Sequence, residues 1–129
     1  RDGADAHDRA YHIFGWVKWD NTERHEEHFP YHSTHFHSLD ESLIVGDGTA
    51  AFECNARPFI QLFKWDGERY VGPKILAFHR STFNNQHAHC HPRFTPDGKY
   101  VLYTSDLTAY SNMYLVEVGD FDDLPDLEE

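Results

Sequence analysis

A short apolar pattern that recurs three times most limits the folds open to this chain. The sequence of residues 15–20 (GWVKWD) returns at 61–66 (QLFKWD) and more loosely at 114–119 (YLVEVG), at spacings of 46 and 53 residues. A four-stranded antiparallel unit of roughly 40 to 50 residues is the repeat of a β-propeller blade. The 129 residues hold about two and a half such units, whereas complete propellers close with about 4 to 8 blades. We therefore expect blades of a larger ring or of an assembly of copies.

The remaining sequence favours an all-β fold. No segment keeps apolar residues at helical spacing, while short runs rich in β-branched and aromatic residues recur between turn residues. We predict strands at 12–19, 35–38, 42–46, 59–65, 74–78, 89–95, 100–105 and 112–118. Asx and Gly pairs typical of hairpins separate many of them, at 20–21, 47–48, 66–67 and 97–98. The blades then span 11–118, between a polar, irregular segment (1–10) and an acidic, solvated tail (119–129).

Charge and composition exclude several kinds of partner. The formal net charge of -11 argues against nucleic acid, which requires a basic surface. No apolar run reaches the roughly 18 to 20 residues that cross a bilayer, and no signal-peptide pattern is present, so we expect no membrane partner. Cys54 and Cys90 do not form a disulfide framework, which favours two free thiols in a reducing, cytoplasmic compartment. The start at Arg1 suggests a piece of a longer protein.

The eleven histidines are clustered, and the clusters predict a metal site. His87, His89 and His91 alternate, and on an extended strand they project to one face. His35 and His37 form a second alternating pair, so two inner strands of adjacent blades could present imidazoles to one ion. Gln86 adds an amide oxygen. Such donors suit Mn, Fe, Ni or Zn better than calcium. The alternative is that these are ordinary hydrogen-bonded histidines. Cys90 points away from them, and we expect it to be buried.

Several of these segments together resemble the C-terminal part of the oligogalacturonate lyases. The likeness rests on the Gln-x-x-His-x-His element at 86–91 and the following Pro-Arg-Phe-Thr-Pro-Asp-Gly at 92–98. It includes 35–38, 44–48 and 101–106, and also 15–22 and 29–30, so it extends over about 11–118. The Gln-x-x-His-x-His element is specific, whereas many propellers share the Pro-Asp-Gly hairpin.

The resemblance implies a seven-bladed propeller with a manganese ion, or another divalent transition metal, bound by three histidines and a glutamine. On this chain Gln86, His89 and His91 match, and the third histidine is His35 or His37, of which we prefer His35. That family cleaves oligogalacturonides by β-elimination. The family's catalytic base lies in a Gly-His-Glu-Phe-Trp type element upstream of the matching region. The chain contains no such element, so the catalytic residue stays unassigned.

Two arginines are candidates for contact with an acidic sugar. Arg80 and Arg93 flank the histidine-rich strand, and guanidinium groups bind carboxylates with two hydrogen bonds. Three interpretations remain open. The chain is the metal-binding C-terminal segment of a lyase, or a truncated propeller fragment that binds metal without turnover, or a TolB-like scaffold for protein partners. An isolated two-blade piece is also expected to associate with itself through its exposed edges.

Overall fold

The described part of the chain is built from antiparallel β-sheets. The computed structural model describes residues 13–28, 33–48 and 58–127. Its strands are β1 (Ile13–Val17), β2 (Arg24–His28), β3 (Phe36–Ser38), β4 (Leu43–Gly46), β5 (Phe59–Trp65), β6 (Tyr70–Phe78), β7 (Arg93–Phe94), β8 (Tyr100–Ser105) and β9 (Asn112–Glu117). Two short 3-10 helices, η3 (Gln86–Ala88) and η4 (Phe121–Asp123), complete the described elements. Within these residues no helix has the length and apolar character that a bilayer crossing needs.

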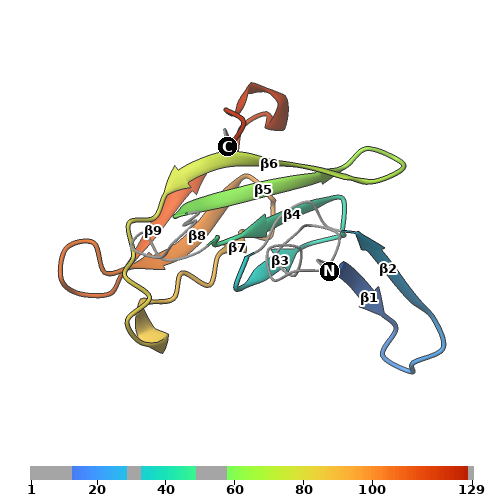
Figure 1. Ribbon diagram of the computed structural model, residues 1–129, viewed down its shortest axis with the longest axis horizontal. Coiled ribbons are helices and arrows are strands. Elements are labelled where there is room, and N and C mark those ends of the chain that lie inside the picture. Colours follow the sequence, from blue (N-terminus) through green and yellow to red (C-terminus); the bar gives the residue numbers. More distant parts are fainter. Residues whose placement is uncertain (1–12, 29–32, 49–57, 128–129) are drawn as a thin grey trace, which may run out of the picture.

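Two of the sheets have the arrangement of propeller blades. Strands β3 to β6 form a four-stranded sheet and β7 to β9 a three-stranded one, each with its strands in chain order (Figure 1). The sequence repeat fits this arrangement, because 61–66 begins in β5 and 114–119 in β9, the third strand of each sheet. The third sheet is the β1–β2 hairpin, which extends to one side. The prediction of all-β propeller blades is confirmed.

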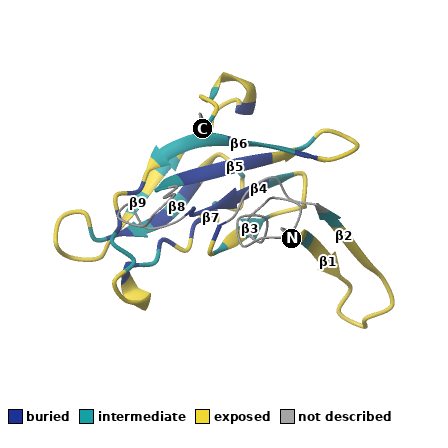
Figure 2. Cartoon of the chain, in the orientation of Figure 1, coloured by how far each residue is buried: buried dark blue, intermediate teal, exposed yellow. Residues whose placement is uncertain are grey.

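The two middle strands of the four-stranded sheet, β4 and β5, are covered on both faces. Along β4 and β5, neighbouring residues point to opposite faces. Val45 and Leu62 join the larger apolar cluster, which includes side chains of the β7–β9 sheet, whereas Ile44 and Phe63 pack on the other side near Phe14 of β1. Both strands are therefore buried, as Figure 2 shows in dark blue. Each such side chain contributes about 1.5–3 kcal/mol by leaving water.

The first strands of the two blades lie side by side. The main-chain N–H of Phe94 in β7 donates a hydrogen bond of 3.0 Å to Nδ1 of His37 in β3. The two rings also pack, with centroids 5.9 Å apart. As a result, the segment before β3 and the segment before β7 lie close to each other.

Strand β6 begins at Tyr70, four residues before the predicted strand at 74–78, and larger differences concern β2 and the segment before β7. Strand β2 was not predicted, because all five of its residues are polar and it shows no apolar alternation. The strand expected at 89–95 is reduced to Arg93–Phe94. Residues 89–92 have no regular secondary structure. They follow η3, whose first turn is capped by the Asn85 side chain, and Pro92 has no N–H for a ladder bond.

The acidic segment after β9 is also more ordered than a solvated tail. Phe121 is buried in the larger apolar cluster, and the Lys74 ammonium lies 2.8 Å from the carboxylate of Asp126. The main-chain N–H of Ile75 in β6 donates to the carbonyl of Pro125. This segment therefore packs against the outer strand of the four-stranded sheet.

Candidate metal centre

Three imidazoles converge where the two blades meet. His35 precedes β3, while His89 and His91 precede β7, and one ring nitrogen from each lies within 4.8 Å of the other two. Bonds of about 2.1 Å to one ion, at octahedral or tetrahedral angles, place two nitrogens about 3.0 to 3.4 Å apart, so side-chain movements on the order of 1 Å bring the three rings onto one ion. The arrangement matches a three-histidine site for a divalent transition metal.

The ring of His35 is oriented by a buried carboxylate. Its Nδ1 lies 2.7 Å from Oδ2 of Asp47, whose side chain is fully buried. An ionised carboxylate only accepts hydrogen bonds, so this contact favours a proton on Nδ1 and leaves Nε2 as the ring nitrogen available to a metal. Oδ1 of the same carboxylate accepts from the main-chain N–H groups of Thr34 and His35, at 3.0 and 2.9 Å.

His89 has a ring nitrogen suited to a metal. Its Nδ1 is buried, and no hydrogen-bond partner reaches it among the described residues. A buried polar atom without a partner is costly, which favours an additional ligand at this position. The ring is stacked on Phe83, with centroids 4.9 Å apart, and Phe83 stacks on His79 in turn.

His91 completes the group on its exposed side. Its ring centroid is 4.0 Å from that of His35, and its main chain has a φ of 43°, in the left-handed region. Partial burial and the nearby imidazoles of His35 and His89 lower the pKa of His91 below its usual value. The neutral imidazole is the form that binds metals.

His37 is not one of the three converging imidazoles, and Gln86 lies beside them in sequence. His37 is two residues from His35, but its Nδ1 accepts the hydrogen bond from Phe94 described above. Burial and the charge of Arg93 lower the pKa of His37. Gln86 is exposed in η3, and its main chain lies near the ring of His91. Gln86 is thus next to the site.

The two arginines predicted to contact substrate, and Cys90, lie outside the group of three imidazoles. Arg93 begins β7 close to His37, and Arg80 follows β6 with a φ of 56°. Both are exposed. Cys90 is fully buried between two ligands in sequence, as predicted, and burial raises the pKa of its thiol. Cys54 lies outside the described residues.

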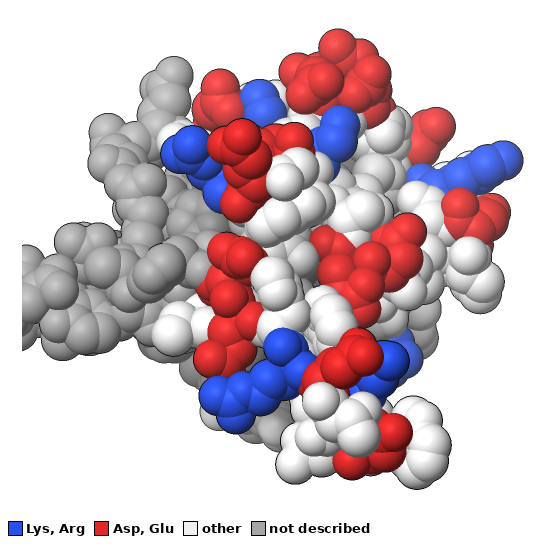
Figure 3. All heavy atoms as spheres, turned by 90° about the vertical axis from the view of Figure 1, so that its right-hand side faces the viewer, with Lys and Arg blue, Asp and Glu red and all other residues white. Residues whose placement is uncertain are grey.

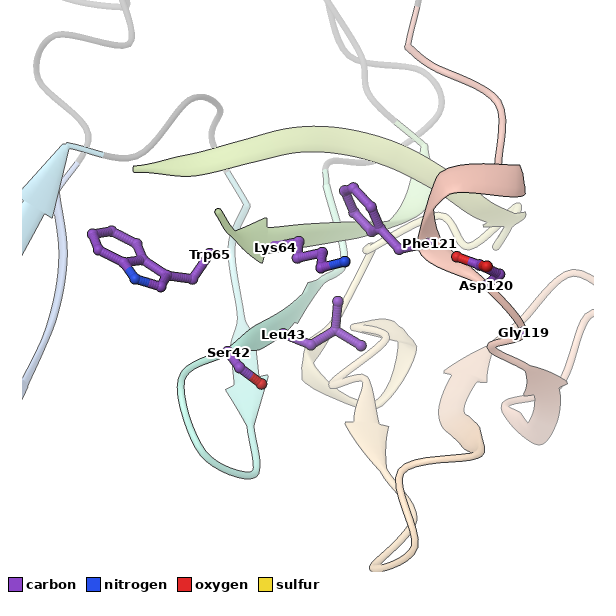
Figure 4. Close-up of a pocket in the computed structure, with 7 residues that line it drawn as sticks. All are labelled: Ser42, Leu43, Lys64, Trp65, Gly119, Asp120 and Phe121. Atoms are coloured by element: carbon purple, nitrogen blue, oxygen red, sulfur yellow. The ribbon is translucent and has the colours of Figure 1, made fainter. Parts of the chain in front are cut away.

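A cavity and an acidic face are two further features of the described surface. A cavity of about 520 Å³ lies between the β4–β5 region and the segment around η4, and it contains none of the clustered histidines (Figure 4). Lys64 is its one basic side chain, and the Lys64 ammonium lies 5.9 Å from the ring centroid of Phe121. Figure 3 shows a face on which acidic side chains predominate and basic ones are interspersed. The histidine group therefore remains the strongest candidate.

Sequence reasoning missed two residues that shape this group. Asp47 was interpreted as part of a turn pair with Gly48, and its contact with His35 depends on how β3 and β4 pair. Phe83 lies in a polar stretch with no strand pattern. The sequence contains a signal for Asp47 but not for Phe83. An aspartate at the end of a strand that pairs with a histidine-bearing strand can accept a hydrogen bond from an imidazole.

Comparisons with known proteins agree on one family. No family model matches the chain. The oligogalacturonide lyase of Pectobacterium atrosepticum is 33% identical and the oligogalacturonate lyase of Dickeya dadantii 30% identical, each over 64% of this chain. The chain spans about a quarter of the length of these relatives, 24% of each.

Solved structures show the same likeness. The oligogalacturonate lyase of Vibrio parahaemolyticus superposes with a TM-score of 0.67 at 26% identity. An oligogalacturonate lyase in complex with manganese superposes with a TM-score of 0.65 at 27% identity. Each match covers 84% of this chain and 29% of the solved chain. In sequence and in fold, the chain is therefore homologous to a portion of the oligogalacturonate lyases.

Proposed function

We propose that this chain forms the metal-binding part of a lyase that cleaves oligogalacturonides by β-elimination. The observation that supports it most is the convergence of three imidazoles from two adjacent blades, with the ring nitrogens within 4.8 Å. Under this proposal His35, His89 and His91 hold a divalent ion such as Mn²⁺, and the Gln86 side chain supplies an oxygen donor. His37 is assigned to joining β3 and β7 instead.

The reaction explains why such a site is useful. β-Elimination removes the proton on C5 of a uronate and expels the oxygen on C4, which leaves an unsaturated sugar. The C5 proton is only weakly acidic. When bound, a divalent ion supplies positive charge beside the uronate carboxylate, which stabilises the negative charge that develops as the proton leaves. We propose that Arg80 and Arg93 contact carboxylates of the oligosaccharide. The base is not assigned to this chain.

Metal analysis tests the first part of the proposal. The chain, purified without chelators and supplied with Mn²⁺, is expected to retain about one ion per molecule. His89→Ala is expected to lose it, because one of three imidazoles is removed. His25→Ala is the control, since His25 lies on the β1–β2 hairpin and stacks on Trp16, away from the group. Equal metal content in the native chain and His89→Ala contradicts the assignment.

Incubation with digalacturonate tests the second part. Growth of the ultraviolet absorbance of an unsaturated uronate, in the native chain and not in His89→Ala, supports lyase activity. Bound metal without that absorbance assigns the chain to metal binding alone. Neither metal nor absorbance favours a scaffold of the TolB type.

A further inference from the structure

Asp47 is distinguished from the other carboxylates by its place next to the three imidazoles. It follows β4, and its side chain has no exposed surface. Three N–H groups surround the carboxylate: the main-chain groups of Thr34 and His35 and Nδ1 of the His35 ring. Among the described residues, neither lysine nor arginine forms an ion pair with it. A buried negative charge with no such partner favours a positive charge close by.

The blade repeat supplies a direct comparison. Asp106 follows β8 as Asp47 follows β4. Like Asp47, it accepts hydrogen bonds from the segment that precedes the first strand of its own blade. Its partners are the main-chain N–H of Thr82 at 2.9 Å and the hydroxyl groups of Thr82 and Ser81. In both blades, an aspartate after the second strand thus holds the segment that precedes the first strand. Only Asp47 adds an imidazole of the candidate metal centre.

We propose that Asp47 is a positioning residue that holds the proton on Nδ1 of His35 and directs Nε2 toward the metal. The inference rests on the proposed metal-binding function. A histidine ligand that donates its second nitrogen to a carboxylate is fixed in tautomer and ring orientation and is a stronger donor. Asp47 also places one negative charge beside the ion.

The test compares two matched variants, Asp47→Asn and Asp106→Asn. Mn²⁺ affinity is measured by calorimetry, and nitrogen couplings in the electron spin echo spectrum of bound Mn²⁺ count the coordinated imidazoles. Asp47→Asn is expected to lower affinity about 10- to 100-fold and to weaken the coupling of one imidazole. Asp106→Asn is expected to keep the native spectrum and nearly native affinity, since its partners are outside the group.

The outcomes separate this inference from the proposed function. Failure of the native chain to bind Mn²⁺ overturns both. A native chain that binds, with an Asp47→Asn variant equal to it in affinity and spectrum, overturns the positioning role alone. Equal losses in both variants assign Asp47 a merely structural role and overturn it as well.

The native chain provides a measurement that does not depend on a folded variant. In the metal-free protein labelled with ¹⁵N-histidine, NMR distinguishes the two neutral tautomers of each ring. We expect His35 to carry its proton on Nδ1, because that nitrogen lies 2.7 Å from the carboxylate. A proton on Nε2 of His35 overturns the proposal.

Discussion

At the scale of single residues, two histidines that are nearly identical in sequence context have different roles. His35 and His37 are two positions apart, so alternation places them on the same face of a strand. However, β3 begins only at Phe36, and His35 lies in the irregular segment before it. Sequence could therefore predict that a ligand comes from this pair, but the choice between them depends on contacts with Asp47 and Phe94, which are distant in sequence.

This difference predicts the behaviour of two substitutions. His35→Ala is expected to abolish Mn²⁺ binding, because it removes one of three imidazoles. His37→Ala is expected to retain the metal and to lower stability by about 0.5–1.5 kcal/mol through loss of the bond from the Phe94 N–H. Metal content and urea denaturation of both variants provide the check. Retention of metal by His35→Ala, or its loss from a folded His37→Ala, would reverse the assignment.

At the scale of elements, the prediction succeeded for most of the short runs rich in β-branched and aromatic residues. Strands β5 and β8 have the predicted bounds, and β3, β4 and β9 differ by one residue at one end. It failed for β2, which is held by pairing with β1 and not by burial. It also failed before β7, where Asn85 caps a 3-10 turn that the histidine pattern does not reveal. In that segment, hydrogen bonds from the main chain to the Asn85 side chain favour the 3-10 turn over the extended strand that the alternating histidines suggest.

The core strands are expected to dominate stability. Leu62 in β5 is fully buried, so Leu62→Ala is expected to lower the free energy of unfolding by about 2–5 kcal/mol. Leu115 in β9 is 58% exposed, and Leu115→Ala is the matched control, with an expected change within about 0.5 kcal/mol. Urea denaturation measures both. Similar losses in the two variants would mean that the sheets do not pack as described.

At the scale of the whole molecule, the outer edge of β9 in the three-stranded sheet has no partner strand among the described residues. Strand β9 is at the end of the β7–β8–β9 order, and Met113 and Leu115 on one of its faces are 67% and 58% exposed. An apolar edge strand is a site for pairing with another chain. The exposed edge of β9 is therefore the surface through which we expect the chain to associate with itself.

This surface gives a prediction for the isolated chain. We expect reversible association that increases with concentration, measured by sedimentation velocity. The double substitution Met113→Lys and Leu115→Lys is expected to shift the distribution toward monomer, because charged side chains on an edge strand oppose pairing. Glu68→Lys, in the exposed turn between β5 and β6, is the control. A chain that remains monomeric at all concentrations would contradict this prediction.

The placement of the three imidazoles on two blades has a consequence for how the site comes into being. The first blade contributes a single ring, and the second contributes two, so neither half contains a complete set of donors. Under the proposed metal binding, capture of the ion by all three rings requires that the two blades have docked. Metal content then reports on blade docking as well as on the histidines themselves.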